Sequence, residues 1–309
     1  MGDHNRTVTR RGLLLFASLG LAWGIPYLFI KIAVGELEPA MVVLARSGLA
    51  AVLLLPLAFY RREVWTVLRR WKPMLAYTIV EIVLPWYFLS SAEQKLPSST
   101  AGLLLAAVPL AGVAIAFLIG RPAKLSTLNW VGILVGMLGV AALVGLDVGG
   151  SDLPSVLEMG VVVVGYALGP AILSRWMPDL PGVGVVAISL AGAAIVYVPL
   201  VVFTNSWPTS WPSTEVTVAI IVLAVICSAL AFLLMVGLIA EIGPVRATAI
   251  TYVNPAVAIL AGVLILNERV TVWTILGFAL VLSGSWLVTH HRREAVPAAG
   301  PEEASAKLE

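Results

Sequence analysis

Charged residues, cysteine and histidine are scarce in this chain. Only 12% of its 309 residues are charged, whereas 60% are apolar, and the mean hydropathy is +1.00. A soluble domain carries about 25% charged residues, so this sequence cannot cover a water-exposed surface of its size. One cysteine excludes a disulfide framework, a net charge of +2 gives no basic surface for nucleic acid, and the three histidines lie near the chain ends. We therefore expect a membrane protein that is not an enzyme and holds no metal or cofactor.

Ten apolar stretches are long enough to cross a bilayer as helices, which takes about 20 residues each. They are 12–30, 39–60, 73–92, 96–120, 125–146, 155–174, 183–203, 216–240, 247–267 and 270–289. Hydrocarbon offers no partner to backbone polar groups, so helices are the expected structure at these lengths. The sequence predicts an all-α membrane protein with ten transmembrane helices, the first of them a retained helix rather than a cleaved signal peptide.

The basic residues are distributed very unequally between the two sides of the predicted membrane. If the N-terminus is cytoplasmic, fifteen Lys and Arg residues fall on the cytoplasmic side, and only Lys95 and Arg269 fall in external loops. Because basic residues favour cytoplasmic loops, we predict that both termini are cytoplasmic. Residues 1–11 then form a cytoplasmic N-terminus and 290–309 a disordered cytoplasmic tail of a multi-pass protein in the plasma (inner) membrane.

Proline, glycine and basic residues of the first half recur in the second half at a nearly constant spacing. The offsets lie between 143 and 146 residues, and the matched pairs are Pro26 with Pro170, Lys31 with Arg175, Pro56 with Pro199, Pro109 with Pro255, Gly132 with Gly277 and Gly139 with Gly284. The stretches 73–92 and 216–240 align poorly. Since each half holds five helices, the second half enters the membrane from the opposite side. We predict two inverted five-helix repeats, 12–146 and 155–289, an architecture typical of secondary transporters.

Short motifs in both halves resemble those of the EamA-type drug/metabolite transporter family. They are Trp23-Gly24, Lys31, Arg46, the junction of the third and fourth helices, and Asn254-Pro255 through Asn267-Glu268-Arg269. The resemblance covers residues 12–289. It implies a ten-helix inner-membrane carrier that moves small metabolites, often outward, with the helices at 125–146 and 270–289 as packing supports. The chain departs from the family in its first half, where Gly120-Arg121-Pro122 has no acid at the place of Glu268.

Glu81 is the sharpest single feature of the predicted spans. It follows the start of its helix by nine residues and lies about 13 Å deep. A carboxylate at that depth must be paired, hydrated or protonated. Tyr77, Glu81, Pro85 and Phe88 share one helical face. Glu81 is therefore a candidate for a proton relay or a cation-binding group, and the alternative is a structural partner of Arg46 or of another buried donor.

One basic residue lies directly after the first predicted span and another lies within the second. Lys31 comes near the outer end of the first helix, where snorkelling alone accounts for it, although its match to Arg175 favours a pair of gate charges. Arg46 lies about 10 Å below the outer surface, too deep to remain without a partner. Structural pairing and the binding of a substrate carboxylate both explain Arg46.

Pro109 and Pro255 are candidates for helix breaks near the middle of the membrane. Each removes a backbone hydrogen bond and frees a carbonyl. Breaks at matching places in two repeats indicate a central site, to which Thr251, Tyr252 and Asn254 would add polar contacts. The alternative is a simple kink that shapes packing.

Several aromatic residues in the spans are candidates for cavity walls, because rings bind apolar or cationic groups. Packing explains a lone aromatic residue equally well, and Trp207 and Trp211 are typical of an external interfacial belt. The cavity candidates are Trp23, Tyr27, Trp86, Tyr87, Tyr166 and Tyr252.

The sequence favours a secondary carrier that works by alternating access and exports small metabolites such as amino acids. It has no ATP-binding motif, so the solute's own gradient or an ion gradient drives transport. Glu81 favours protons as the coupling ion. Export of aromatic or cationic drug-like compounds is the alternative within the transporter class, and a channel or an assembly protein is the alternative outside it. The expected partners are a small-molecule solute and the lipid bilayer, and assembly into a homo-oligomer is left open.

Overall fold

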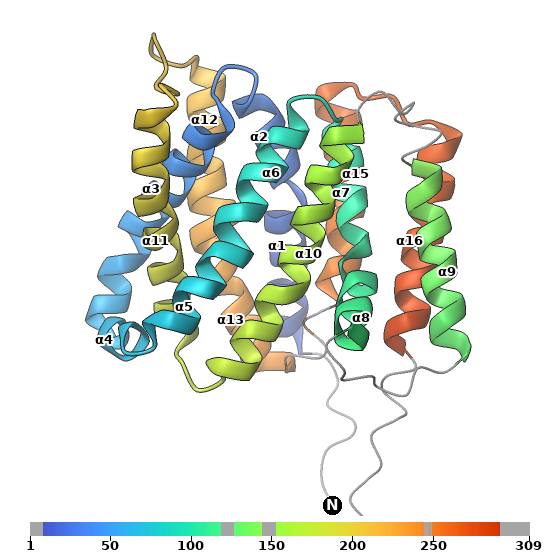
Figure 1. Ribbon diagram of the computed structural model, residues 1–309, viewed down its shortest axis with the longest axis horizontal. Helices are drawn as coiled ribbons and strands as arrows, with labels where there is room; N and C mark the ends of the chain where they lie inside the picture. The colour runs from blue at the N-terminus through green and yellow to red at the C-terminus, as the bar shows by residue number, and fades with distance from the viewer. Residues whose placement is uncertain (1–8, 119–126, 144–152, 244–246, 248, 291–309) are drawn as a thin grey trace, which may run out of the picture.

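The computed structural model describes residues 9–118, 127–143, 153–243, 247 and 249–290, and these form helices and turns with no strand (Figure 1). The predicted all-α class is therefore confirmed for the described part of the chain. Residues 1–8 and 291–309, which belong to the predicted cytoplasmic ends, lie outside the described residues, as does Gly120-Arg121-Pro122.

The first half of the chain is a series of helices with two internal irregularities. Its elements are α1 (Arg10–Gly24), α2 (Pro26–Ala33), α3 (Pro39–Tyr60), α4 (Glu63–Leu68), α5 (Trp71–Tyr77), the π-helix η1 (Thr78–Val83), α6 (Leu84–Glu93), α7 (Ser98–Leu104), the 3₁₀ turn η2 (Leu105–Ala107), α8 (Val108–Leu118) and α9 (Thr127–Ala142). The second half contains α10 (Leu153–Trp176), α11 (Gly182–Phe203), α12 (Thr214–Ala224), the π-helix η4 (Val225–Leu230), α13 (Ala231–Ile242), α15 (Ile250–Leu266) and α16 (Val272–His290).

Helix starts are set by proline and by hydroxyl side chains. Pro26 opens α2 and Pro39 opens α3, where the missing backbone N–H costs nothing. The hydroxyls of Thr9 and Ser213 accept hydrogen bonds from the backbone N–H groups of Gly12 and Val216 and so cap α1 and α12.

Seven helices within the described residues are long and apolar enough to cross a membrane. They are Arg10–Ala33, Pro39–Tyr60, Trp71–Glu93, Ser98–Ala116, Leu153–Trp176, Gly182–Phe203 and Thr214–Ile242. Three shorter apolar helices, Thr127–Ala142, Ile250–Leu266 and Val272–Val288, occupy the remaining predicted stretches. Within the described residues, helices thus occur in all ten predicted stretches, whereas a count of ten spans remains a prediction.

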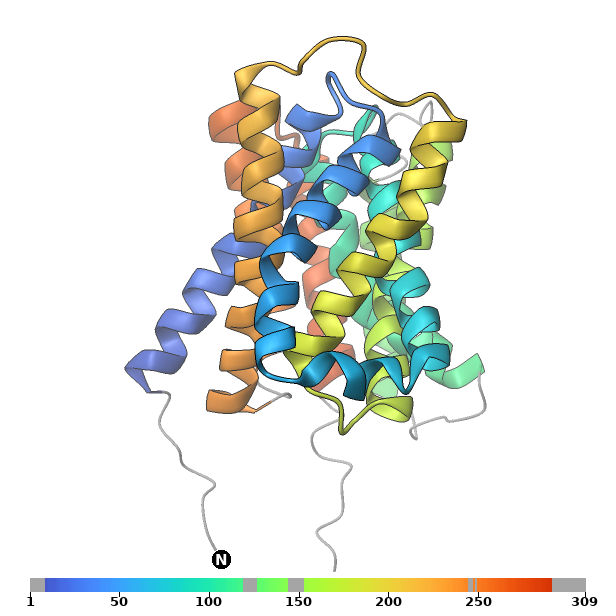
Figure 2. The same cartoon turned by 90° about the vertical axis from the view of Figure 1, so that its left-hand side faces the viewer.

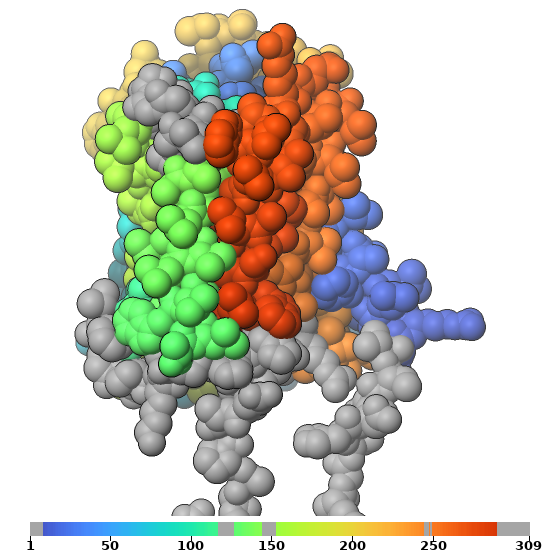
Figure 3. Space-filling model, turned by 90° about the vertical axis from the view of Figure 1, so that its right-hand side faces the viewer, coloured from blue at the N-terminus to red at the C-terminus, as the bar shows by residue number. Residues whose placement is uncertain are grey.

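Contacts between the two halves follow the pairing expected of related repeats. Helix α1 of the first half packs on α13 and α15 of the second half. The matching helix α10 of the second half packs on α6 and α8 of the first half. Two further pairs join matching helices, α3 with α11 (Figure 2) and α9 with α16 (Figure 3). This exchange of partners between the halves is what a pseudo-two-fold axis produces.

Glycines bring α9 and α16 into backbone contact. A Cβ added at Gly132 would lie 2.8 Å from the carbonyl oxygen of Gly284, and one at Gly139 would lie 2.7 Å from the backbone nitrogen of Val281. Small residues allow helices to approach this closely. The outer face of this pair exposes apolar side chains, as expected of a surface that contacts lipid (Figure 3): Leu134, Met137, Leu138 and Ile275.

The two π-helices occupy matching positions in the halves. η1 begins at Thr78 and η4 begins at Val225, an offset of 147 residues, so Glu81 and Ser228 are equivalent positions. Each π-helix receives a polar side chain from the helix beside it. Tyr197 of α11 donates its hydroxyl to the carbonyl of Val83, and Arg46 of α3 bonds to Ser228. Single-turn π segments inside α-helices are frequent at functional sites.

Candidate functional site

Arg46 lies in the middle of a buried polar cluster where helices of both halves meet. Its side chain is 6% exposed. Nε donates a 2.9 Å hydrogen bond to Oγ of Ser228, and the guanidinium stacks 3.7 Å from the ring centroid of Trp86. Among the described residues no carboxylate lies within the 4.0 Å of an ion pair with Arg46. The structure thus holds the guanidinium by a hydroxyl and a ring, and leaves its charge without a counter-charge.

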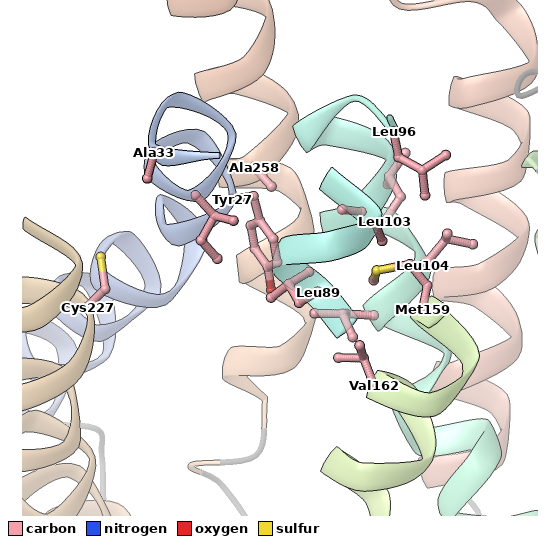
Figure 4. Packing of buried hydrophobic residues seen from close by; sticks show 14 of the residues in the cluster. Tyr27, Ala33, Leu89, Leu96, Leu103, Leu104, Met159, Val162, Cys227 and Ala258 are labelled. Atoms are coloured by element: carbon pink, nitrogen blue, oxygen red, sulfur yellow. The ribbon is translucent and has the colours of Figure 1, made fainter. Parts of the chain in front are cut away.

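Tyr27 and Tyr166 surround this arginine with aromatic surface. Tyr27 is buried in the apolar cluster between α2, α7 and α15 (Figure 4), where a Cβ added at Gly102 would lie 2.5 Å from Cβ of Ala258 and 3.3 Å from the Tyr27 ring. Tyr166 of α10 borders the two largest apolar clusters, one containing Tyr27 and the other containing Trp86. Both tyrosines lie within electrostatic range of Arg46. Three predicted aromatic residues therefore gather around the predicted arginine.

Glu93, the last residue of α6, is a charged residue of this region that the sequence analysis missed. Its side chain is fully buried, and neither carboxyl oxygen has a hydrogen-bond partner among the described residues. It interacts electrostatically with Tyr27, Lys31 and Arg46. In sequence Glu93 stands next to Gln94-Lys95 at the end of an apolar stretch, which indicates an interfacial loop. Packing of α2 and α7 over the end of α6 is what buries it.

Glu81 lies in η1 and packs against the backbone of α10. Its carboxyl oxygen occupies the position that a Cβ at Gly169 would take. The buried Oε2 of Glu81 has no hydrogen-bond partner among the described residues. Tyr77, one turn earlier, and Tyr166 lie within electrostatic range of this carboxyl. The structure therefore does not pair Glu81 with Arg46 in this conformation.

Lys31 and Glu268 hold the turn between α6 and α7 from opposite sides. The ammonium of Lys31 donates to the carbonyl oxygens of Glu93 (2.6 Å) and Leu96 (3.0 Å) at the end of α6. The carboxylate of Glu268 accepts hydrogen bonds from the backbone N–H groups of Ser98 (2.7 Å) and Ser99 (3.0 Å) at the start of α7. Both charges complement the helix ends that they meet.

The pKa of Glu268 reflects this cap. Burial acts to raise the pKa of the carboxyl, but hydrogen bonds from Ser99 and Ser98 outweigh it and hold the pKa below its ordinary value. Asn267 adopts a left-handed conformation, with φ of 55°, and turns the chain so that Glu268 reaches α7. A Cβ at Gly262 would fill the space that the carboxylate occupies.

The other predicted site residues lie apart from Arg46. Trp23 packs edge-on against Phe232, with 5.7 Å between ring centroids. The hydroxyl of Tyr252 donates to the carbonyl of Ser285 in α16 at 3.2 Å. Asn254 has a buried Oδ1 without a hydrogen-bond partner among the described residues.

The two predicted helix breaks differ in the structure. Pro109 follows the 3₁₀ turn η2 and lies in the first turn of α8, where an absent N–H leaves no helical bond unmade. Pro255 lies inside α15, which runs without interruption from Ile250 to Leu266. The irregular backbone of the second half lies instead in η4, for which the sequence carries no signal in its hydropathy.

No group of three or more His, Cys, Asp or Glu side chains among the described residues is placed to hold a metal ion. The arrangement around Arg46 is suited instead to an organic solute. It offers one cation, aromatic walls and buried carboxyl groups at two levels of the same helix.

A match to the EamA-like transporter family covers residues 10–145 and again residues 155–290, which together make up most of the chain. The chain belongs to the EamA-like transporter family. Each half of this EamA-like transporter matches the family separately, in agreement with the exchange of helix partners between the halves. Family membership makes the protein a membrane transporter, and its described helices carry it across the bilayer several times.

Individual relatives are similar over almost the whole length. The EamA-like transporter is 31% identical over 279 residues to the uncharacterized inner membrane transporter YedA of Escherichia coli K12, which covers 87% of this chain and 88% of YedA. It is 22% identical over 302 residues to the uncharacterized transporter YvbV of Bacillus subtilis strain 168, over 96% and 98% of the two chains. A crystal structure with 21% identity shares the fold, with a TM-score of 0.66 over 91% of this chain and 98% of that chain.

Proposed function

We propose that this EamA-like transporter is a secondary-active exporter of small metabolites such as amino acids. It works by alternating access in the inner membrane, with both termini in the cytoplasm. The two matching halves support alternating access, because inverted repeats supply two gates around one site. The excess of basic residues on one side supports the orientation, and the name of YedA as an inner membrane transporter supports the location.

The observation that carries the proposal is the state of Arg46. A buried guanidinium with no counter-charge costs several kcal/mol, and stacking on Trp86 with one hydrogen bond to Ser228 offsets only part of that cost. A solute carboxylate that binds the guanidinium in a bidentate manner supplies the missing charge. A small organic acid or a zwitterion therefore fits the site better than a simple cation does.

Glu81 is the proposed coupling residue. Its buried carboxyl oxygen is unpartnered within the described residues, so loss and gain of a proton at this position changes the charge inside the bundle. A proton that binds on one side of the membrane and leaves on the other then drives the solute in exchange. Replacement of Glu81 by Gln is expected to abolish acceleration of transport by a pH gradient, whereas solute exchange at equal pH persists.

Counterflow in proteoliposomes tests the proposal. The purified protein is reconstituted and offered labelled amino acids, purines and quaternary ammonium ions in turn. Saturable exchange of amino acids is expected, and Arg46→Gln is expected to reduce it more than tenfold, because the carboxylate contact is lost. Arg61→Gln is the matched control, since Arg61 is exposed at the end of the same helix. Equal activity of the two variants would contradict the assigned role, and no exchange of any compound by folded protein would overturn the proposed function.

A second candidate is export of aromatic or cationic compounds. The unpaired carboxyl of Glu81 and the rings of Tyr166 and Trp86 favour it, because rings and carboxylates together bind organic cations. Exchange of quaternary ammonium ions that depends on Glu81 and not on Arg46 would select this candidate.

A further inference from the structure

Glu93 is the one fully buried carboxyl of the described residues with both oxygens unpartnered, and nothing in the mechanism above uses it. Arg46 carries the opposite charge in the same region and also lacks a counter-charge. Two opposite charges that are buried close together without forming an ion pair are costly, unless a third group binds to both of them. A solute that carries both charges could bind the Arg46 guanidinium and the Glu93 carboxyl together.

The register of α6 puts the two charges on the same side of one helix. Trp86, on which Arg46 stacks, precedes Glu93 by seven residues, so the two share a face and lie about 10 Å apart along the axis. Side chains of an α-helix all lean toward its N-terminus, so this offset of about 10 Å carries over from the backbone to the side chains of Trp86 and Glu93. Glu93 interacts electrostatically with Lys31, with Glu268 and, more weakly, with Arg46, so Arg46 is within range of this carboxyl although Lys31 affects it more.

The other charged groups near Glu93 already have partners. The ammonium of Lys31 on α2 faces two backbone carbonyls, and the carboxylate of Glu268 faces two backbone N–H groups of α7. On α10, Glu158 accepts a 2.9 Å hydrogen bond from Ser91 of α6. Glu81 lies three turns earlier along the same transmembrane helix, against Gly169. Lys31 is the main counter-charge near Glu93, but its ammonium donates to backbone carbonyls, so both carboxyl oxygens of Glu93 remain without a hydrogen bond among the described residues. Arg46 likewise has no ion pair among these residues.

We propose that Arg46 and Glu93 are the two charged contacts of one binding site, which recognises both charges of a zwitterion of amino-acid size. Arg46 binds the carboxylate of the solute and Glu93 binds its ammonium group. Tyr27, buried in the neighbouring apolar cluster with its hydroxyl toward Leu89 (Figure 4), gives the site an aromatic wall. This inference rests on the proposed function and adds to it the charge pattern of the solute and the residue that reads the amine.

Competition in the counterflow assay separates the two contacts. Labelled L-leucine, L-phenylalanine and L-serine are the probes, and each is competed with three compounds: the amino acid, its deaminated acid and its decarboxylated amine. For the wild type, the zwitterion is expected to compete at least tenfold better than either analogue, because each analogue leaves one buried charge unmatched.

The two variants are expected to lose different preferences. Glu93→Gln, which keeps the size of the side chain, abolishes the preference for the amino acid over the deaminated acid and keeps the preference over the amine. Arg46→Gln does the reverse. A residue with only a structural role would weaken all three compounds together. Glu215→Gln, exposed at the start of α12, is the control and is expected to keep both preferences.

Each outcome decides one of the two proposals. If Glu93→Gln keeps the wild-type preference for the zwitterion over the deaminated acid, Glu93 does not read the amine and the inference is wrong. Exchange of purines or quaternary ammonium ions without exchange of amino acids also overturns the zwitterion site. The protein would then still be a transporter, but of another class of solute. Where a variant is folded but does not turn over, protection of the protein from thermal unfolding by the same three compounds gives the same comparison.

Discussion

At the scale of single residues, contacts with glycine decide where buried acids can lie. The Glu81 carboxyl fills the space next to Gly169 of α10, and Pro85 lies against Gly165 one turn away, where an added Cβ would be 2.6 Å from the proline ring. Gly160 of the same helix has open space around its Cα. Gly169 therefore makes room for the acid and Gly165 makes room for Pro85 and the carbonyl of Val80, whereas Gly160 serves no contact.

Substitution of these glycines by alanine is expected to have opposite effects. Gly169→Ala forces the Glu81 carboxyl and η1 away from α10 and lowers the free energy of unfolding by about 1–3 kcal/mol, as overpacking does. Gly160→Ala is expected to raise it by about 0.5–1 kcal/mol, because alanine favours the helix. Thermal unfolding of both variants in detergent measures the difference. A gain in stability for both would show that Glu81 does not need the space at Gly169.

The sequence identifies some site residues better than others, for a physical reason. Glu81, Arg46 and Lys31 stand within apolar stretches, where any charge is conspicuous. Glu93 stands beside Gln94-Lys95 and has no such background, so only the packing of other helices over α6 reveals its burial. The contacts of Tyr252 with α16 are equally invisible, because they depend on how α15 rotates about its axis.

At the scale of elements, charges from distant parts of the chain hold the ends of α6 and α7. Glu268 caps the first turn of α7 across 170 residues of sequence, and Lys31 satisfies the last carbonyls of α6. Such caps replace the hydrogen bonds that helix ends lack. In the sequence, the first half has no acid at the place of Glu268.

The stability contributed by Glu268 is expected to depend on pH. Its pKa is lower in the folded protein than its ordinary value of 4.5. The contribution is therefore fully present above about pH 4.5 and is lost as the pH falls through the lower, folded pKa. Glu268→Gln is expected to cost about 1 kcal/mol at pH 7 and progressively less as the pH falls below 4.5.

Unfolding in detergent between pH 3 and pH 7 checks this dependence. Glu215→Gln is the control variant, because Glu215 is exposed and makes no cap between distant segments. A constant difference between wild type and Glu268→Gln over this range would mean that the carboxylate charge does not support α7.

Helix irregularities are harder to predict than helices. Each of the ten predicted apolar stretches contains helix in the described residues, and Pro109 indicates the irregular turn before α8. η1 and η4 leave no trace in hydropathy, because a π turn changes hydrogen bonding without changing which residues are apolar. Once the structure is known, their offset of 147 residues aligns the two stretches that align poorly by sequence.

At the scale of the whole molecule, the paired prolines and glycines already indicate a repeat, and the packing of the halves explains why. Gly132, Gly139 and Gly284 lie at the contact of α9 with α16, two helices that are matched with each other in the repeat. Because both helices need glycine at this contact, glycine recurs at the same place in each repeat. Which side of the membrane each end faces depends on charge outside the bundle, and so needs its own measurement.

Cysteine labelling tests the orientation. Cys227, the sole cysteine, is buried, so Cys227→Ala provides a background in which single cysteines are introduced at exposed positions at the two ends. Ser210→Cys lies in the loop between α11 and α12, and Thr66→Cys lies in α4 at the opposite end of the molecule (Figure 1).

Basic residues gather at the end that holds α4, so that end is expected to face the cytoplasm. In intact cells a membrane-impermeant maleimide should therefore label Ser210→Cys at once and Thr66→Cys only after permeabilisation. The reverse pattern would place both termini outside and overturn the proposed orientation.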